Sequence, residues 1–236
     1  MSAPLFPSVM PGLSLFLPRT CVICSAPLSL AGALRSVPLC EACDRELVGL
    51  PAPRCPLCGR PIAGLAGPCL DCRRWPHAFD EAFPLFDFHG GAGILIAAFK
   101  FGGRRSLASW FALRLGAAIS ERWPDRVIVP VPPRKAVVAE RGWDHVALVA
   151  KGLRTMGFRI ANPLCRAPSL QQKHLGLAER RSNAARAYAL APEANVPAEI
   201  VLLDDVFTSG STADACSRAL KGGGARAVAF VAIAAD

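Results

Sequence analysis

The sequence predicts an α/β protein in which a doubly wound parallel sheet with flanking helices follows a small module stabilised by zinc. Three observations support this fold class. Cysteine pairs crowd the first third of the chain, apolar strand patterns alternate with helical ones after residue 80, and an acidic pair with a hydroxyl-rich loop follows one of these strands. The 236 residues are 52% hydrophobic and 19% charged, which excludes a disordered chain, a collagen, a coiled coil and a small disulfide scaffold.

Eight of the ten cysteines form four Cys-x-x-Cys pairs near the start of the chain. A gap of two residues turns both thiolates of a pair toward one ion, and four thiolates complete a closed tetrahedral zinc site of the structural kind. Fifteen residues separate the first two pairs and ten the last two, which is typical of zinc ribbons. We therefore expect two structural zinc ions, with the ligands Cys21, Cys24, Cys40, Cys43, Cys55, Cys58, Cys69 and Cys72.

Other uses of these cysteine pairs fit less well. Disulfides are disfavoured in a cytosolic chain, and a thioredoxin-like pair would occur once and be followed by a helix. An iron–sulfur cluster stays open as an alternative, because a set of thiolates does not by itself name the metal. The spacing also leaves open whether the pairs combine in sequence or interleave. The lone Cys165 and Cys216 are expected to be small buried residues.

Apolar periodicity after residue 80 predicts alternating strands and helices. A strand pair is expected over residues 81–88, single strands over residues 126–131, 158–165, 199–203 and 227–234, and helices over residues 94–101, 107–119, 145–156 and 212–221. Residues 166–187 are polar and basic and interrupt this pattern. Loops of that length are usually functional or disordered, and the alternative is a plain surface excursion.

The net charge of +9 is concentrated in the middle of the chain. Residues 99–186 contain 17 basic and five acidic residues, a net charge of +12, whereas residues 187–236 have a net charge of −3. This asymmetry indicates a polyanion bound by the central segment, with an Arg-rich solvated surface as the alternative. Four prolines interrupt the uncharged first 18 residues, so neither a membrane span nor a secretory signal is expected, and we expect a cytoplasmic protein.

The most informative stretch joins the strand of residues 199–203 to the next helix. Asp204 and Asp205 end this strand, and the loop after them consists of Val206, Phe207, Thr208, Ser209, Gly210, Ser211 and Thr212. Backbone N–H groups and hydroxyls at the start of a helix would bind a phosphate, and glycine permits its close approach. The two carboxylates suit the hydroxyls of a ribose or a bound Mg²⁺. An ordinary strand-to-helix turn would leave the adjacent acids unexplained.

This stretch resembles the phosphoribosyl-pyrophosphate (PRPP) loop of type I phosphoribosyltransferases. Together with the four cysteine pairs, the chain resembles the ComF family, in which a double zinc ribbon precedes a phosphoribosyltransferase domain. The motifs that carry this resemblance are Lys100 with Gly102, Val129-Pro-Val-Pro132, Arg141-Gly142-Trp143, Arg166, Gln172, Glu179-Arg180 with Asn183, and the acid pair with Thr208-Ser209-Gly210. The chain departs from the family at Asp144-His145, where Asn-Gln is usual.

The resemblance implies a double zinc ribbon over residues 15–75 and a type I phosphoribosyltransferase-like domain over residues 80–236. It also implies that residues 206–212 and Lys100 bind PRPP with Mg²⁺, that Asp204 and Asp205 fix the sugar, and that Arg134 and Arg141 stabilise the departing pyrophosphate. Residues 166–187 would be the flexible loop that closes over the site. Its candidate site residues are Arg166, Gln172, Lys173 and Arg180.

The ComF resemblance further implies a role in DNA uptake or natural transformation. Its partners would be single-stranded DNA and competence or recombination proteins. Two alternatives stay open: an active phosphoribosyltransferase of nucleotide metabolism with an unknown acceptor, and a non-catalytic adaptor whose zinc ribbons recruit proteins. No residue stands out as a general base, so the sequence leaves open whether transfer occurs.

Overall fold

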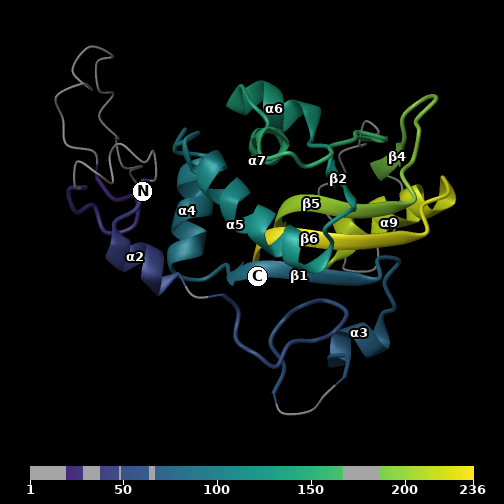
Figure 1. The fold of residues 1–236 in the computed structure, drawn as a ribbon, viewed down its shortest axis with the longest axis horizontal. Coiled ribbons are helices and arrows are strands. Elements are labelled where there is room, and N and C mark those ends of the chain that lie inside the picture. Colours follow the sequence, from purple (N-terminus) through teal and green to yellow (C-terminus); the bar gives the residue numbers. More distant parts are fainter. Residues whose placement is uncertain (1–19, 29–37, 48, 64–66, 167–186) are drawn as a thin grey trace, which may run out of the picture.

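A four-stranded parallel sheet in the order β1-β6-β5-β2 forms the centre of the computed structural model (Figure 1). The structure describes residues 20–28, 38–47, 49–63, 67–166 and 187–236. The strands are β1 (Glu81–Asp87), β2 (Val127–Pro130), β5 (Glu199–Phe207) and β6 (Ala227–Ala235). The central strands β5 and β6 consist mostly of buried apolar residues, as is typical of a parallel sheet covered on both faces.

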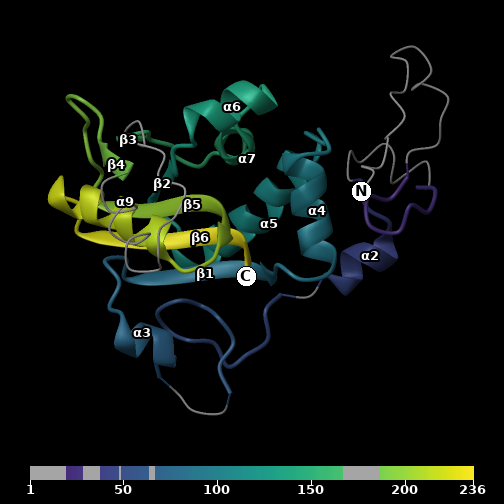
Figure 2. The same ribbon diagram turned by 180° about the vertical axis from the view of Figure 1, so that it is seen from behind.

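Helices cover both faces of this sheet (Figures 1 and 2). On one face α4 (Gly91–Lys100), α5 (Leu107–Arg122) and α7 (His145–Thr155) share a core with Val201 and Leu203 of β5. On the other face α9 (Ser211–Gly222) shares a core with Ile200 and Leu202. Because side chains alternate along a strand, Val201, Leu203 and Asp205 face α4, α5 and α7, whereas Ile200, Leu202 and Asp204 face α9. The alternation reverses at the end of the strand, where Val206 packs on the first core and Phe207 lies in the second. This alternation decides where the two acids at the end of β5 point.

Two expected strand segments differ from the structure. The strand pair expected over residues 81–88 is the single strand β1, which pairs with β6. The strand expected over residues 158–165 is interrupted: Ile160 forms one parallel bridge with Ile128, and the strand β3 (Leu164–Arg166) begins only after Pro163. Proline lacks the N–H that a β ladder needs, which explains the break. β3 pairs antiparallel with β4 (Tyr188–Leu190) in a separate small sheet.

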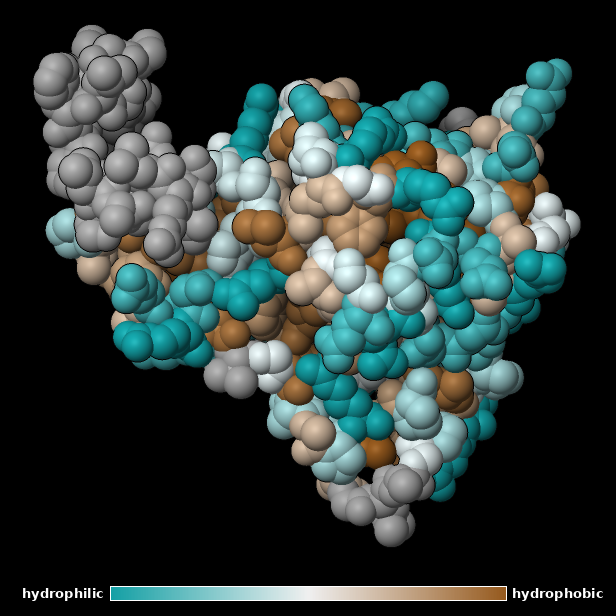
Figure 3. Space-filling view, viewed as in Figure 1, coloured by the Kyte–Doolittle hydropathy of each residue, from teal (hydrophilic) through white to brown (hydrophobic). Residues whose placement is uncertain are grey.

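The cysteine-rich segment is built into the core on both faces of the sheet. It contains the short helices α2 (Glu41–Glu46) and α3 (Leu70–Arg74). Cys21 and Cys43 belong to the core beneath α4 and α5, whereas Cys55 and Cys58 belong to the core beneath α9. The segment around α3 projects from the sheet as a wedge in the space-filling view (Figure 3). Within the described ranges, no helix combines the length and apolar composition that crossing a membrane requires.

Candidate functional site

The paired cysteines gather into two clusters, and in each the four sulfur atoms lie within 4.8 Å of one another. The pairs combine in sequence order: Cys21, Cys24, Cys40 and Cys43 form the first cluster, and Cys55, Cys58, Cys69 and Cys72 the second. The Sγ atoms of Cys24 and Cys40, and those of Cys58 and Cys69, are 3.7 Å apart.

This sulfur spacing matches a tetrahedral zinc site. Four sulfurs placed about 2.3 Å from a zinc ion lie about 3.8 Å apart, whereas a disulfide would bring two sulfurs to about 2 Å. Backbone N–H groups of Cys43 and Cys69 point at the sulfurs of Cys40 and Cys55, at 3.5 and 3.3 Å, which favours thiolates. The donor sets therefore fit two structural zinc ions, each with four sulfur ligands.

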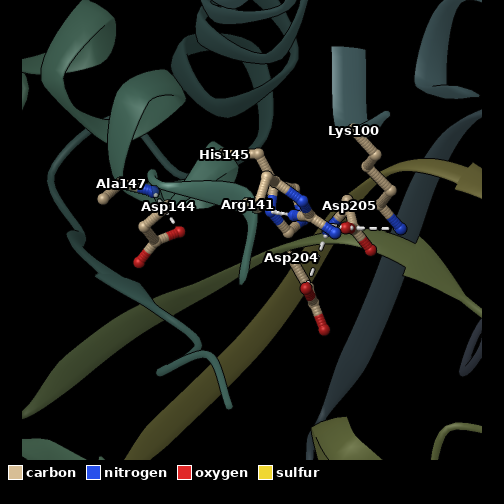
Figure 4. Close-up of polar contacts among 7 residues, drawn as sticks. All are labelled: Lys100, Arg141, Asp144, His145, Ala147, Asp204 and Asp205. Atoms are coloured by element: carbon tan, nitrogen blue, oxygen red, sulfur yellow. Dashed lines mark hydrogen bonds and ion pairs between the residues drawn. The ribbon is translucent and has the colours of Figure 1, made fainter. Parts of the chain in front are cut away.

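Asp205, at the carboxyl end of β5, is surrounded by cationic and polar groups from α4 and α7 (Figure 4). Lys100 Nζ lies 2.6 Å from Asp205 Oδ2, and His145 Nε2 hydrogen-bonds to the same oxygen. Arg141 continues the chain of contacts, because its guanidinium nitrogen lies 2.5 Å from His145 Nδ1. Burial would raise the pKa of Asp205, but the hydrogen bond from His145 and the charge of Lys100 outweigh it and lower the pKa.

Asp204 lies in the opposite environment, on the face of the sheet covered by α9. Burial first, and then the negative charge of Asp205, raises the pKa of Asp204 to about 8. The charge of Arg166 acts in the other direction. Arg166 itself donates a 2.7 Å hydrogen bond to the Tyr188 hydroxyl and lies 4.7 Å over the tyrosine ring. The pKa values of the two neighbouring carboxyl groups are therefore shifted in opposite directions, lowered for Asp205 and raised for Asp204.

The loop after these acids joins β5 to α9 but is shorter than the sequence predicts. The strand continues through Val206 and the buried Phe207, which the sequence assigned to the loop, and only residues 208–210 separate β5 from α9. Gly210 adopts a left-handed conformation (φ 73°) at the N-cap of α9, and a Cβ there would lie 3.1 Å from both His77 Cε1 and Phe207 Cζ. The hydroxyls of Ser209 and Ser211 are 2.8 Å apart. Only glycine combines this backbone conformation with so close a neighbour, so the shape of the loop depends on this residue.

A side chain from the second zinc ribbon also holds this loop. Arg60 comes two residues after Cys58, and its guanidinium donates to the carbonyl oxygen of Thr208 and, at 2.6 Å, to that of Asp236. The same guanidinium lies 5.4 Å over the ring of Phe207. Arg60 therefore links the second zinc ribbon to the loop between β5 and α9, where Thr208 lies 148 residues further along the chain.

The structure gathers some of the sequence-predicted residues and separates others. Lys100 and Arg141 join Asp205, and Arg166 lies on the Asp204 side. Arg134 is exposed at the N-cap of α6 (Lys135–Arg141). Gln172, Lys173 and Arg180 lie outside the described residues. Cys216 is buried and Cys165 half-buried.

Sequence reasoning missed two residues at this site, His145 and Arg60. His145 stood out only as a departure from the ComF pattern, and nothing in the sequence around Arg60 pointed to the loop. Both were hard to find because their partners lie in other elements, 60 and 148 residues away.

Comparison with known proteins agrees with this architecture. Residues 12–73 match the family model of the double zinc ribbon domain. The competence protein ComFC of Bacillus subtilis (strain 168) is 26% identical over 178 residues, which cover 70% of this chain and 71% of that protein. The chain is a ComFC homologue with a double zinc ribbon.

Solved structures similar to this ComFC homologue include two phosphoribosyltransferases. One is a hypoxanthine phosphoribosyltransferase from Staphylococcus aureus, with 8% sequence identity and a TM-score of 0.35; the match covers 54% of this chain and 62% of that chain. The other is an orotate phosphoribosyltransferase from Aeropyrum pernix, with 14% sequence identity and a TM-score of 0.33; the match covers 61% of this chain and 64% of that chain. A third is the allosteric regulatory enzyme of purine biosynthesis, with 14% sequence identity and a TM-score of 0.36; the match covers 57% of this chain and 29% of that chain. The chain spans less than two thirds of each. With TM-scores below 0.5, the fold assignment rests on the sheet topology and the ComFC match.

In this ComFC homologue, Cys58→Ser is expected to lower the zinc content from two ions per chain to one. The second ribbon should also lose stability, because the metal replaces a core that so short a segment cannot build. Metal analysis and thermal unfolding measure both effects. Cys165→Ser, outside the clusters, serves as the matched control and should keep two ions. Protein without zinc and with eight oxidised cysteines would contradict the assignment.

The raised pKa of Asp204 predicts a pH-dependent stability. The folded protein keeps a proton that the unfolded chain loses near its ordinary pKa of 3.8, so this group lowers stability as the pH rises from about 4 to about 8. Asp204→Asn removes that titration. Relative to the original protein, the variant should gain more than about 1 kcal/mol in free energy of unfolding between pH 5 and pH 8. Urea unfolding at both pH values measures this gain.

The matched control for Asp204→Asn is Asp125→Asn, the same chemical change at an exposed position. Its free energy of unfolding should follow that of the original protein at both pH values. A difference between Asp204→Asn and the original protein that stays constant from pH 5 to pH 8 would show that Asp204 titrates normally.

Proposed function

We propose that this protein binds a pentose 5-phosphate of the PRPP type, together with Mg²⁺, at the carboxyl end of β5. The observation that carries this proposal is the junction of β5 and α9, where two half-buried carboxyl groups lie close to the small and hydroxylated residues at positions 208–212. Ligands of open parallel sheets bind beyond the carboxyl ends of the strands. The start of α9 offers N–H groups and the positive end of the helix dipole to a phosphate.

The surrounding charges suit the remaining parts of such a ligand. Sugar hydroxyls would replace Lys100 and His145 as the partners of Asp205, and the released Lys100 would then be available to a diphosphate group. Arg141, adjacent to His145, and the exposed Arg134 would add positive charge on the same side. Asp204 would bind a sugar hydroxyl or Mg²⁺ after losing its proton, because a cation favours the carboxylate form.

We further propose that the protein acts in the cytoplasm in the handling of DNA during uptake or transformation, with recombination proteins as partners. The name of the B. subtilis relative, a competence protein, supports this process. In this proposal residues 15–75 are the ribbon domain and residues 80–236 the phosphoribosyltransferase-like domain. Transfer to an acceptor base would make the protein an enzyme, in which Arg134 and Arg141 stabilise the leaving pyrophosphate and loop closure over the site excludes water.

A surface patch next to the Asp205 site favours direct contact with single-stranded nucleic acid. Phe101 is 79% exposed, and the guanidinium of Arg141 lies 5.5 Å from its ring centre. Arg104 and Arg105 are exposed in the same loop, and Arg105 lies 5.4 Å over the ring of Trp143. Cations interleaved with aromatic rings bind the phosphates and bases of single strands.

Calorimetric titration of PRPP with Mg²⁺ tests the proposed ligand. The original protein should bind it, and Asp205→Asn should weaken binding at least about tenfold, because a hydrogen bond to a charged group contributes about 1.5–3 kcal/mol. Thr208→Val, at an exposed loop position, should weaken binding less. Asp125→Asn is the matched control. An unchanged affinity of Asp205→Asn for PRPP would contradict the proposed binding site. Release of pyrophosphate on addition of a nucleobase would identify the protein as a transferase.

Salt-dependent binding of a single-stranded oligonucleotide tests the basic patch. The logarithm of affinity should fall with the logarithm of salt concentration by about 0.7 per phosphate contact. Replacing both Arg104 and Arg105 by Ala should flatten this slope by about one to two units without changing PRPP affinity. Replacing Arg73 and Arg74 in α3 removes the same charge elsewhere and should leave the slope unchanged. If binding is unmeasurable even at low salt, DNA contact depends on partner proteins.

A further inference from the structure

A pocket of about 450 Å³ lies between the segment that leaves the second zinc ribbon and the beginning of α9. One wall consists of Trp75, Pro76 and His77, and the other of Ser209, Ser211, Asp214, Ala215 and Arg218. Ser209 and Ser211 also belong to the loop in which the proposed function places a 5-phosphate. A ligand bound in that loop could therefore continue into the pocket without crossing a wall of the protein.

One carboxylate fixes the two walls relative to each other. Asp214 accepts a 2.6 Å hydrogen bond from the N–H of Ala78, directly after the ribbon segment, and pairs with Arg218 Nε at 2.9 Å. His77 is stacked on Phe79, with 4.5 Å between ring centres and 16° between planes. Phe79 is buried in the core beneath α9, so the ribbon wall is anchored in that core. The pocket is thus held open by contacts of the protein with itself.

The chemistry of the walls suits a nucleotide. Trp75 is 50% exposed, and an indole ring provides a surface on which a nucleobase stacks. The side chain of Arg218 is 60% exposed, so its guanidinium can contact a ligand phosphate while Nε stays paired with Asp214. The hydroxyls of Ser209 and Ser211 add two hydrogen-bonding groups. A volume of about 450 Å³ lies within the range of about 300–1,000 Å³ that is usual for small-molecule sites.

We propose that this pocket binds a nucleoside that is joined, through the phosphate, to the pentose 5-phosphate in the loop. This inference rests on the proposed function and narrows its ligand class. The preferred ligand would then be extended at its 5-phosphate, by a diphosphate or a phosphodiester bridge, and not a simple monoester. A free dinucleotide and the end of a nucleic-acid strand both carry that chemistry. The second zinc ribbon would supply part of the ligand site through Trp75.

Titration with two related ligands tests the pocket. Ribose 5-phosphate fills only the loop, whereas ADP-ribose carries the same group with an adenosine phosphate attached to its phosphorus. ADP-ribose should bind at least about fivefold more tightly, which is the smallest gain expected from the stacking of one base on an aromatic ring. Trp75→Ala should remove that gain and leave the affinity for ribose 5-phosphate unchanged. Arg218→Gln, at an exposed position, should reduce the gain in the same way, and Arg226→Gln is its exposed control.

The outcomes separate the pocket from the proposed function. If the original protein binds both ligands with equal affinity, the proposed nucleoside pocket is contradicted and the proposed sugar phosphate site is not. If it binds neither ligand, both proposals are contradicted. A variant that lowers both affinities by the same factor would show a structural role for its residue and count against the pocket. Zinc content and thermal unfolding, measured on each variant, identify misfolded protein. A short single strand that displaces ADP-ribose would support a strand end as the source, and failure to displace it would support a free dinucleotide.

Discussion

Two adjacent, half-buried carboxyl groups near the end of β5 constrain the structure around them. Buried charges need partners, and two like charges on neighbouring residues disfavour each other's ionisation. The strand separates them, because alternation directs Asp205 toward α4 and α7 and Asp204 toward α9. Asp205 is paired with Lys100 and His145, whereas burial and the charge of Asp205 raise the pKa of Asp204. Both carboxyl groups therefore gain their polar partners only when the elements on both faces of the sheet are packed against it.

Local sequence patterns were enough to predict the parallel sheet and the two groups of four cysteines. The apolar run of β6 is buried along nearly all its length, and a continuous run of this kind indicates a central parallel strand. The cysteine pairs were equally direct, because two-residue spacing is itself the geometry of a metal site. In these cases each pattern lies within one short stretch of the chain, so the sequence around each element already contains the information.

The contacts that shape the site could not be predicted in the same way. The partner of His145 is fixed by how α7 lies on β5, and the partner of Arg60 by how the second ribbon lies against β1 and β6. The order of the cysteine pairs was left open for the same reason, since spacing fixes each pair but not which pairs meet. Distances between elements depend on the packing of the whole core, and this packing cannot be derived from local patterns in a single sequence.

The position of the second ribbon indicates that its cysteine cluster affects more than the stability of the ribbon itself. A phosphate loop must keep its N–H groups and hydroxyls directed outward, so the apolar core cannot hold it by burial alone. Here Arg60, which belongs to the second ribbon, donates a hydrogen bond to the Thr208 carbonyl. A second hydrogen bond attaches the cysteine turn to β1: the N–H of Ala82 donates to the Leu57 carbonyl at 2.7 Å. The zinc ligands Cys55 and Cys58 fix the turn from which Arg60 extends. The second cysteine cluster and the loop between β5 and α9 are therefore joined by one short connection, the side chain of Arg60.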